Sequence, residues 1–109
     1  EVLRLASASS EKNLAAPEFL GLRGDLLLAI SRDHAAEAEA LYQMAISIAR
    51  ELQASMLELR AALRLSRLWQ AQGKTQAARN VLSEAYAKMT EGFTLPDLQQ
   101  AQALLKELA

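Results

Sequence analysis

The chain contains no cysteine and only one histidine among its 109 residues. The absence of cysteine excludes disulfides, thiol catalysis and cysteine-bound metal sites, and it fits a reducing compartment, so we expect a cytoplasmic protein. A single histidine also excludes metal binding by several histidines of one chain, and no cofactor is expected. As a catalyst His34 would need a positioned partner. Beside Asp33, at the expected start of a helix, it is instead expected to lie in an exposed turn.

Neither an excess of one charge nor a long apolar run is present. Twelve Lys and Arg residues stand against thirteen Asp and Glu residues, which leaves no electrostatic footprint for DNA or RNA. No apolar run approaches the length of a membrane span, and the first residues lack the basic start and apolar core of a signal peptide. We therefore expect neither a nucleic-acid nor a membrane partner. The sequence begins at Glu1 without Met, which is consistent with a piece of a longer protein.

Proline and β-branched residues are scarce, whereas alanine and leucine dominate, and this composition favours helices over strands. Apolar residues recur at helical spacing along most of the chain. The first sixteen residues lack a clear period and are expected to be a partly ordered N-terminal segment. The pattern predicts five helices, at 17–31, 34–53, 56–72, 75–91 and 95–108.

Several residues suit the expected helix ends. Ser55 and Glu58 form a capping-box pattern before the third helix. Asp33 and Thr75 are good N-caps for the second and fourth helices. Gly73 suits the left-handed residue that ends a helix, and Gly92 is expected to end the fourth helix, near an inward-facing Phe93. Gly21 and Gly24 weaken the first helix, and we expect a close neighbouring helix to compensate.

The chain resembles itself at an offset of 40 residues. Ala38 falls on Ala78 and Ala45 on Ala85, and small residues at these positions allow close packing of two helices. A fixed period with one helix pair per period is typical of a helical solenoid. The expected organisation is repeat 1 at 17–54, repeat 2 at 55–93 and a capping helix at 94–109, all within one helical-repeat domain at 17–109.

Residues 72–78 with Ala85 resemble the tetratricopeptide consensus, in which a glycine turn precedes alanines at fixed offsets. The chain departs from that consensus in its period, about 40 residues rather than 34, and in having Ser66 where glycine is usual. The resemblance implies an all-α, tetratricopeptide-like α-solenoid of two helix pairs plus a C-terminal capping helix. It also implies a protein or peptide partner.

A closer resemblance covers residues 55–73 and 86–98, with 22–28 in the preceding repeat. These stretches look like the C-terminal region of bacterial multidomain regulators that carry a signal-transduction ATPase module, often joined to an adenylate or guanylate cyclase or to a DNA-binding domain. The resemblance implies a regulatory, protein–protein interaction module and carries no catalytic residue onto this chain. A purely architectural terminal cap of a longer array and an RNA-binding helical repeat remain as alternatives, although the near-neutral charge argues against RNA.

The most informative polar set is a strip of three arginines along the third helix. In tetratricopeptide-like stacking the first helix of each pair lines a concave groove, and the 40-residue offset extends the groove to the first helix. The competing interpretation is a solvated or internally paired face. Trp69 and Tyr86 are expected in the core. The predicted partner-binding groove comprises Leu20, Arg23, Leu27, Arg60, Arg64 and Arg67.

Apolar residues of the first helix span more sides than one partner helix needs. Such an uncovered patch predicts self-association, and a two-fold homodimer is the commonest solution. The residues concerned are Phe19, Leu20, Leu26, Leu27 and Ile30.

Overall fold

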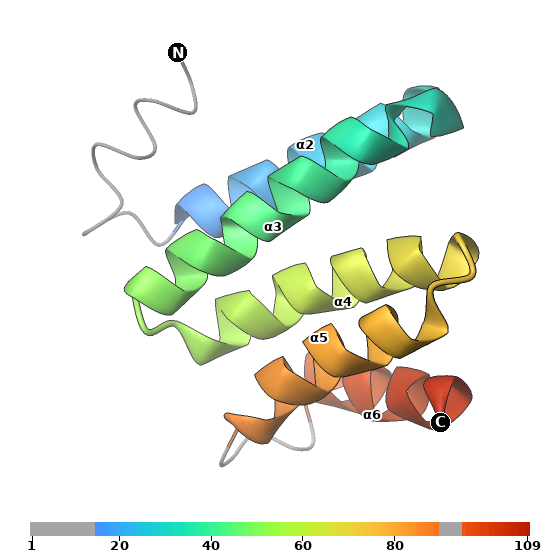
Figure 1. Cartoon of the computed structure of the whole chain (residues 1–109). Coiled ribbons are helices and arrows are strands. Elements are labelled where there is room, and N and C mark those ends of the chain that lie inside the picture. The colour runs from blue at the N-terminus through green and yellow to red at the C-terminus, as the bar shows by residue number, and fades with distance from the viewer. Residues whose placement is uncertain (1–14, 90–94) are drawn as a thin grey trace.

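Every element formed by the described residues, 15–89 and 95–109, is helical in the computed structural model (Figure 1). This confirms the predicted all-α class. Five α-helices are present in this part of the chain, and a short 3-10 helix lies between the first two. They are α2 (Ala15–Ile30), η1 (Arg32–His34), α3 (Ala35–Glu51), α4 (Ser55–Ala71), α5 (Thr75–Ala87) and α6 (Pro96–Leu108).

Most helix boundaries differ from the predicted ones by one or two residues, and the end of α5 differs by four. α2 begins at Ala15 and therefore includes two residues of the expected N-terminal segment. Pro17 is buried in its first turn, where the missing N–H is no loss because those amides have no partner within the helix. α5 ends at Ala87 rather than 91. The predicted roles of Gly92 and Phe93 lie outside the described residues.

The predicted capping box of α4 is absent. Ser55 is the first helical residue, and the N-cap Ala54 makes no side-chain cap. The Glu58 carboxylate, 3% exposed, accepts hydrogen bonds from Arg50 Nε and Lys88 Nζ, both at 3.0 Å. Bonds to two cations outweigh one bond to a backbone amide, so Arg50 and Lys88 hold Glu58 away from the helix start. They join the ends of α3, α4 and α5.

The other two predicted caps are also wrong. Ser31 caps η1, because its Oγ accepts a hydrogen bond from the Asp33 amide at 3.1 Å. Lys74 is the N-cap of α5, and Thr75 is the first helical residue. The N-cap of α3 itself is His34, one residue after Asp33, and it makes no side-chain cap. Both turns therefore contain the expected polar residues, but neither Asp33 nor Thr75 is a cap.

The helices form two layers that alternate along the chain. α3 packs on α2 and α4, and α5 packs on α4 and α6. α4 also contacts both α2 and α6, so these three helices lie side by side on one side of the molecule. In Figure 1, α3 lies in front of α2 and α5 in front of α6. The smallest dimension of the molecule, 20 Å, is that of two helix layers.

Alanines line the contacts between the layers. Ala38, Ala45 and Ala78 are fully buried and Ala85 nearly so, as the repeat pattern requires for close helix packing. Trp69 and Tyr86 are partly buried against the same core, as predicted. The Trp69 indole N–H donates to Glu39 Oε1 at 3.0 Å, which fixes α4 against α3.

Gly73 ends α4 in the left-handed conformation, with φ +82°, as predicted. A Cβ at this position would meet no atom within 4 Å, so any cost of substitution comes from the backbone alone. We expect Gly73→Val to lower the free energy of unfolding by about 1 kcal/mol or more, because β-branched residues disfavour this region. Thermal unfolding measures the loss. Gly73→Asn is the control and should cost less, since asparagine tolerates positive φ; equal melting of all three proteins would refute the assignment.

Candidate functional site

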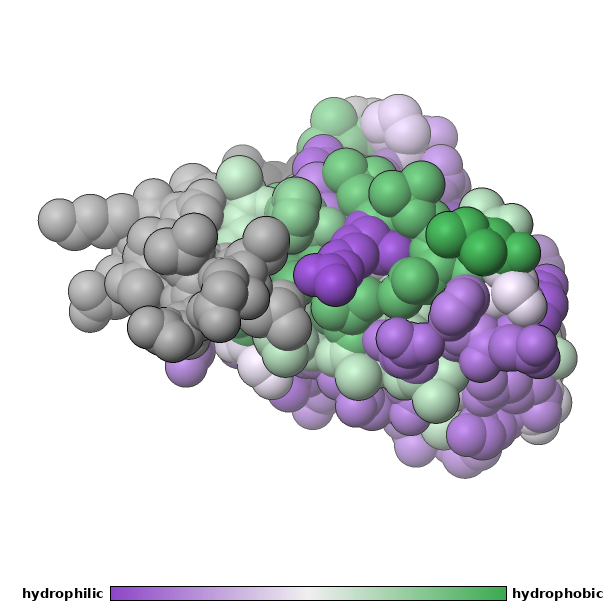
Figure 2. Space-filling view, turned by 90° about the horizontal axis from the view of Figure 1, so that it is seen from above, coloured by the Kyte–Doolittle hydropathy of each residue, from purple (hydrophilic) through white to green (hydrophobic). Residues whose placement is uncertain are grey.

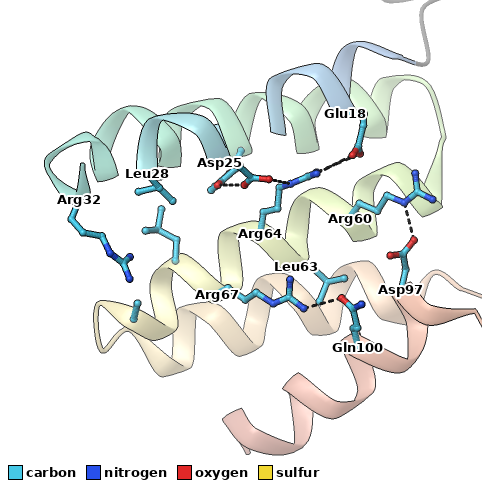
Figure 3. A pocket seen from close by; sticks show the side chains of 13 residues that line it. Glu18, Asp25, Leu28, Arg32, Arg60, Leu63, Arg64, Arg67, Asp97 and Gln100 are labelled. Carbon is cyan, nitrogen blue, oxygen red and sulfur yellow. Dashed lines mark hydrogen bonds and ion pairs between the residues drawn. The ribbon is translucent and has the colours of Figure 1, made fainter. Parts of the chain in front are cut away.

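A pocket of about 520 Å³ opens on the side where α2, α4 and α6 lie next to one another (Figure 3). Its walls carry charged side chains from all three helices and apolar side chains from α2 and α4. Tyr42 of α3 reaches it from the second layer. The lining residues are Glu18, Asp25, Leu28, Arg32, Tyr42, Arg60, Leu63, Arg64, Arg67, Leu68, Ala71, Asp97 and Gln100.

Arg64 lies at the centre of one wall and is held by two acids of α2 (Figure 3). Its Nε donates to Asp25 Oδ2 at 3.0 Å and its Nη2 donates to Glu18 Oε2 at 2.9 Å. The Tyr42 hydroxyl donates to the other Asp25 oxygen at 2.6 Å. The Arg64 side chain is 17% exposed, so this network joins α2, α3 and α4 in a partly desolvated position.

The two glycines of α2 make room for this network. A Cβ at Gly21 would collide with the Arg64 guanidinium, and a Cβ at Gly24 would lie 2.6 Å from Tyr42 Cε1. The expectation that a close neighbour compensates for these glycines is therefore confirmed. The neighbours are side chains of α4 and α3, which cross the surface of α2 where it has no side chain of its own.

The network shifts the pKa of its members. The hydrogen bond from Arg64 lowers the pKa of Glu18, although burial acts in the opposite direction. Burial opposes the charge on Arg64, but hydrogen bonds to Glu18 and Asp25 outweigh it and raise the Arg64 pKa. Burial, and then the hydrogen bond to Asp25, raises the pKa of Tyr42. All three groups therefore keep their usual charge states at neutral pH.

Glu18 should make the stability of the fold depend on acid pH. Its pKa is lower in the folded chain, so its contribution is present above the unfolded value, about 4.3, and is lost as the pH falls through the folded pKa. We expect Glu18→Gln to be less stable than the parent at pH 7, with the difference shrinking toward pH 3. Urea unfolding at several pH values measures this. A difference that is constant with pH would show that the ion pair adds nothing.

The remaining arginines of α4 differ in their partners. Arg60 Nε donates to Asp97 Oδ2 of α6 at 2.8 Å. Among the described residues, the Arg67 side chain bonds only to the neutral amide oxygen of Gln100, to which its Nη2 donates at 2.9 Å. The Arg32 side chain has no hydrogen-bond or ion-pair partner within the described part of the chain. Four arginines against three carboxylates leave the pocket a net charge of +1, and the excess is carried by Arg32 and Arg67.

Arg32 lies at one end of the pocket near Leu28, whereas the Arg67 side chain extends toward Gln100 near the middle of the pocket (Figure 3). Leu28 lies one turn before Arg32, and Leu68 and Ala71 follow Arg67 by one and four residues. The opposite end holds the paired Arg60 and Asp97 beside Glu18 (Figure 3). The part of the pocket lined by Leu28, Arg32, Arg67, Leu68 and Ala71, called here the Arg32–Arg67 end, thus combines two cationic donors with apolar surface.

The structure brings together three of the six residues of the predicted groove. Arg60, Arg64 and Arg67 line the pocket. The three α2 residues lie elsewhere: Leu20 is fully buried in the core, Leu27 packs against that core, and Arg23 is exposed outside the pocket lining. Whether the groove binds a partner stays a prediction.

The misplaced α2 residues have a geometric cause. A single 40-residue offset for both helices of a pair requires equal connections between the paired helices, but the two connections differ. Residues 31–34 contain η1, whereas residues 72–74 form a shorter turn. Because each residue turns an α-helix by about 100°, a small change in the connection brings another side of α2 to the pocket.

Another signal in the sequence marks the correct side of α2. Glu18, Asp25 and Arg32 are separated by seven residues each, and Leu28 falls on the same side. Residues seven apart lie nearly above one another on a helix. This charged row, rather than the offset, would have indicated which side of α2 faces the arginines of α4.

The described part of the chain offers no other group with evident chemistry. His34 lies in η1 with its side chain 33% exposed, and its Nδ1 is 2.8 Å from Glu37 Oε1. Residues 15–89 and 95–109 contain no group of three side chains that could hold a metal ion. None of the helices in those ranges has the length and apolarity to cross a bilayer.

Comparison of the chain with protein-family models, with curated protein sequences and with solved structures gave no match.

Proposed function

We propose that this chain is a non-catalytic interaction module of the tetratricopeptide-like class, and that its pocket binds a peptide through a carboxylate flanked by apolar groups. The alternation of helix contacts supports the class, because α4 touches α2 and α6 while α3 and α5 cover the other side. The proposed role is regulatory: occupancy of the pocket reports the presence of a partner protein.

The observation that carries this proposal is the unequal pairing of the four pocket arginines. Arg60 and Arg64 are held by carboxylates of the chain itself. Arg67 meets only a neutral amide and Arg32 meets no side chain among the described residues. A guanidinium donates two parallel hydrogen bonds to a carboxylate, so these two are the donors that a ligand can engage without breaking the fold.

The surroundings of these donors define the rest of the ligand. Leu28, Leu68 and Ala71 provide apolar surface within a turn of the arginines. A leucine or similar side chain next to the carboxylate would bury apolar area there, at about 25 cal/mol per Å². A peptide segment fits this combination, and a nucleic acid does not, because the pocket as a whole carries almost no excess positive charge.

Titration calorimetry with short peptides tests the proposal. One peptide ends in two leucines with a free terminal carboxylate, a second is the same peptide amidated, and a third is amidated but carries glutamate beside the leucines. Binding of the first or third, but not the second, is expected, and it identifies the source of the carboxylate. Arg32→Gln combined with Arg67→Gln should weaken binding at least about tenfold, since charge-assisted bonds are each worth roughly 1.5–3 kcal/mol.

Two control variants separate recognition from stability. Arg79→Gln changes an arginine of α5 whose side chain donates to Gln76 on its own helix and does not line the pocket, so binding should not change. Arg64→Gln removes a cation from Glu18 and Asp25, so it should lower the melting temperature. Equal binding by the parent and the Arg32/Arg67 double variant would overturn the proposed site.

The wider setting is proposed from the sequence resemblance. Residues 55–73 and 86–98 resemble the C-terminal region of bacterial signalling ATPases and cyclases, so we propose a cytoplasmic regulatory place in such a protein. The gene sequence upstream of Glu1 tests this setting. An ATPase or cyclase module encoded there would support it, and a different kind of domain would oppose it.

An architectural role is the second candidate. α6 presents Gln99, Gln102 and Lys106 to solvent at helical spacing, as expected of a terminal capping helix. A chain that acts only as a cap would bind none of the three peptides. The calorimetric titration therefore also decides between these two functions.

A further inference from the structure

An apolar stripe runs along the side of α2 that faces neither α3 nor the pocket. It consists of Phe19, Leu22, Leu26 and Ile30, which are 47%, 50%, 66% and 73% exposed. The face of the molecule seen in Figure 2 carries a broad apolar area with hydrophilic residues within and around it. A contiguous apolar surface on a helix is unusual in a monomer and marks a contact surface.

The corresponding side of α4 is covered by a packed helix. Glu58 and Trp69 of α4 hydrogen-bond to Arg50 and Glu39 of α3, so these two residues mark the side of α4 that packs on α3. Ala61 and Leu65, between them on that side, are both 1% exposed. The residues of this side, Glu58, Ala61, Leu65 and Trp69, follow successive spacings of three, four and four, and so do Phe19, Leu22, Leu26 and Ile30 of α2.

We infer that the apolar stripe of α2 is a docking surface for a helix hairpin whose second helix packs on α2 as α3 packs on α4. α2 and α4 each have one side that packs on the following helix and one side that lines the pocket. Each also has a third side. In α4 the remaining side is covered by α3. In α2 it is exposed in the described part of the chain. This inference is independent of what the pocket binds.

The chemistry of the stripe specifies the docking helix. Phe19 and Ile30 stand where α4 has Glu58 and Trp69, so the docking helix presents apolar residues where α3 presents Arg50 and Glu39. Arg23 adjoins the stripe, is exposed and has no side-chain partner among the described residues. An acidic residue near the middle of the docking helix would complement it.

A second copy of this chain fits the stripe less well than such a hairpin. α3 of another copy is already covered by α4, and the exposed side of α6 is polar, so neither offers the required surface. A symmetric contact between two α2 helices would place its two-fold axis near the middle of the stripe. The two Arg23 side chains would then approach one another without an intervening acid.

A fused hairpin tests the inference. A second copy of residues 15–54 is inserted between residues 14 and 15. The Leu52, Gln53 and Ala54 of this copy then lead into α2, as the original ones lead into α4. In the added copy the stripe residues become glutamine, and Glu39 and Arg50 become leucine. Hydrogen exchange should show the α2 amides of the original segment protected at least about tenfold, within the range that local packing controls. The fluorescence of bound anilinonaphthalene sulfonate should fall.

A matched control carries Leu22→Asp and Leu26→Asp in the original α2. Because both side chains are exposed, the parent fold should survive, whereas the protection by the fused hairpin should disappear. A fused hairpin that gives no protection, or that stays unfolded, would overturn the inference. So would a dimeric mass of the unfused chain at about 100 μM, a concentration at which micromolar affinity is evident, if the double aspartate variant is monomeric.

Discussion

Leu20→Ala should lower the free energy of unfolding by about 2–5 kcal/mol, the usual cost of removing a fully buried leucine. Leu20 is 0% exposed and belongs to the core between α2 and α3. Leu22 and Leu26 on the same helix are exposed to solvent, whereas removal of the Leu20 side chain leaves a cavity in the core. For a domain of this size each kcal/mol shifts the melting temperature by several degrees, so calorimetry should show a fall of roughly 10 °C or more.

Leu26→Ala is the matched control on the same helix. The chemical change and the helix propensities are identical, but Leu26 is 66% exposed, so its loss should alter stability by less than about 0.5 kcal/mol. Similar small effects of both substitutions would mean that Leu20 faces the groove, as the 40-residue offset predicted. The pair of variants therefore tests which side of α2 is the core.

Gly24→Leu should destabilise the fold by about 3 kcal/mol, at the upper end of the range for overpacking. A Cβ at Gly24 would lie 2.6 Å from Cε1 and 3.0 Å from Cζ of Tyr42, and leucine adds three more carbons. The ring cannot move aside without weakening its 2.6 Å hydrogen bond to Asp25. The gain in helix propensity over glycine, about 1 kcal/mol, is too small to offset this.

A double-mutant cycle with Tyr42→Leu isolates the contact. If the tyrosine ring is the obstacle, Gly24→Leu should cost at least about 1 kcal/mol less in the Tyr42→Leu background than in the parent. Additive effects would assign the cost to something other than Tyr42. Gly21→Ala offers a second comparison and should cost less than Gly24→Leu, because the atoms in its way belong to the flexible end of Arg64.

The helices were predictable from sequence because their signals are local. The apolar period and Gly73 define α4 and its turn, and the alanines of α3 and α5 mark the packed sides. The caps were not predictable in the same way. Glu58, for example, pairs with Arg50 and Lys88 of the neighbouring helices instead of capping its own helix.

The pocket was predictable only from the α4 side. The spacing of Arg60, Arg64 and Arg67 places them on one face, but their partners come from α2 and α6. The rotation of α2 depends on how η1 turns the chain into α3, and no offset between repeats contains that information. The offset therefore predicts Leu20 in the groove and gives no role to Arg32, which the structure places in the pocket.

The central claim, that a peptide carboxylate binds at the Arg32–Arg67 end of the pocket, is tested most directly by NMR of the arginine side chains. The Nε–H signals of the ¹⁵N-labelled chain are followed while the dileucine peptide with a free carboxylate is added. We expect the signals of Arg32 and Arg67 to shift with saturation, while that of Arg64, already bonded to Asp25, changes little. Shifts that appear equally with the amidated peptide, or that are confined to Arg23 beside the apolar stripe of α2, would contradict the claim.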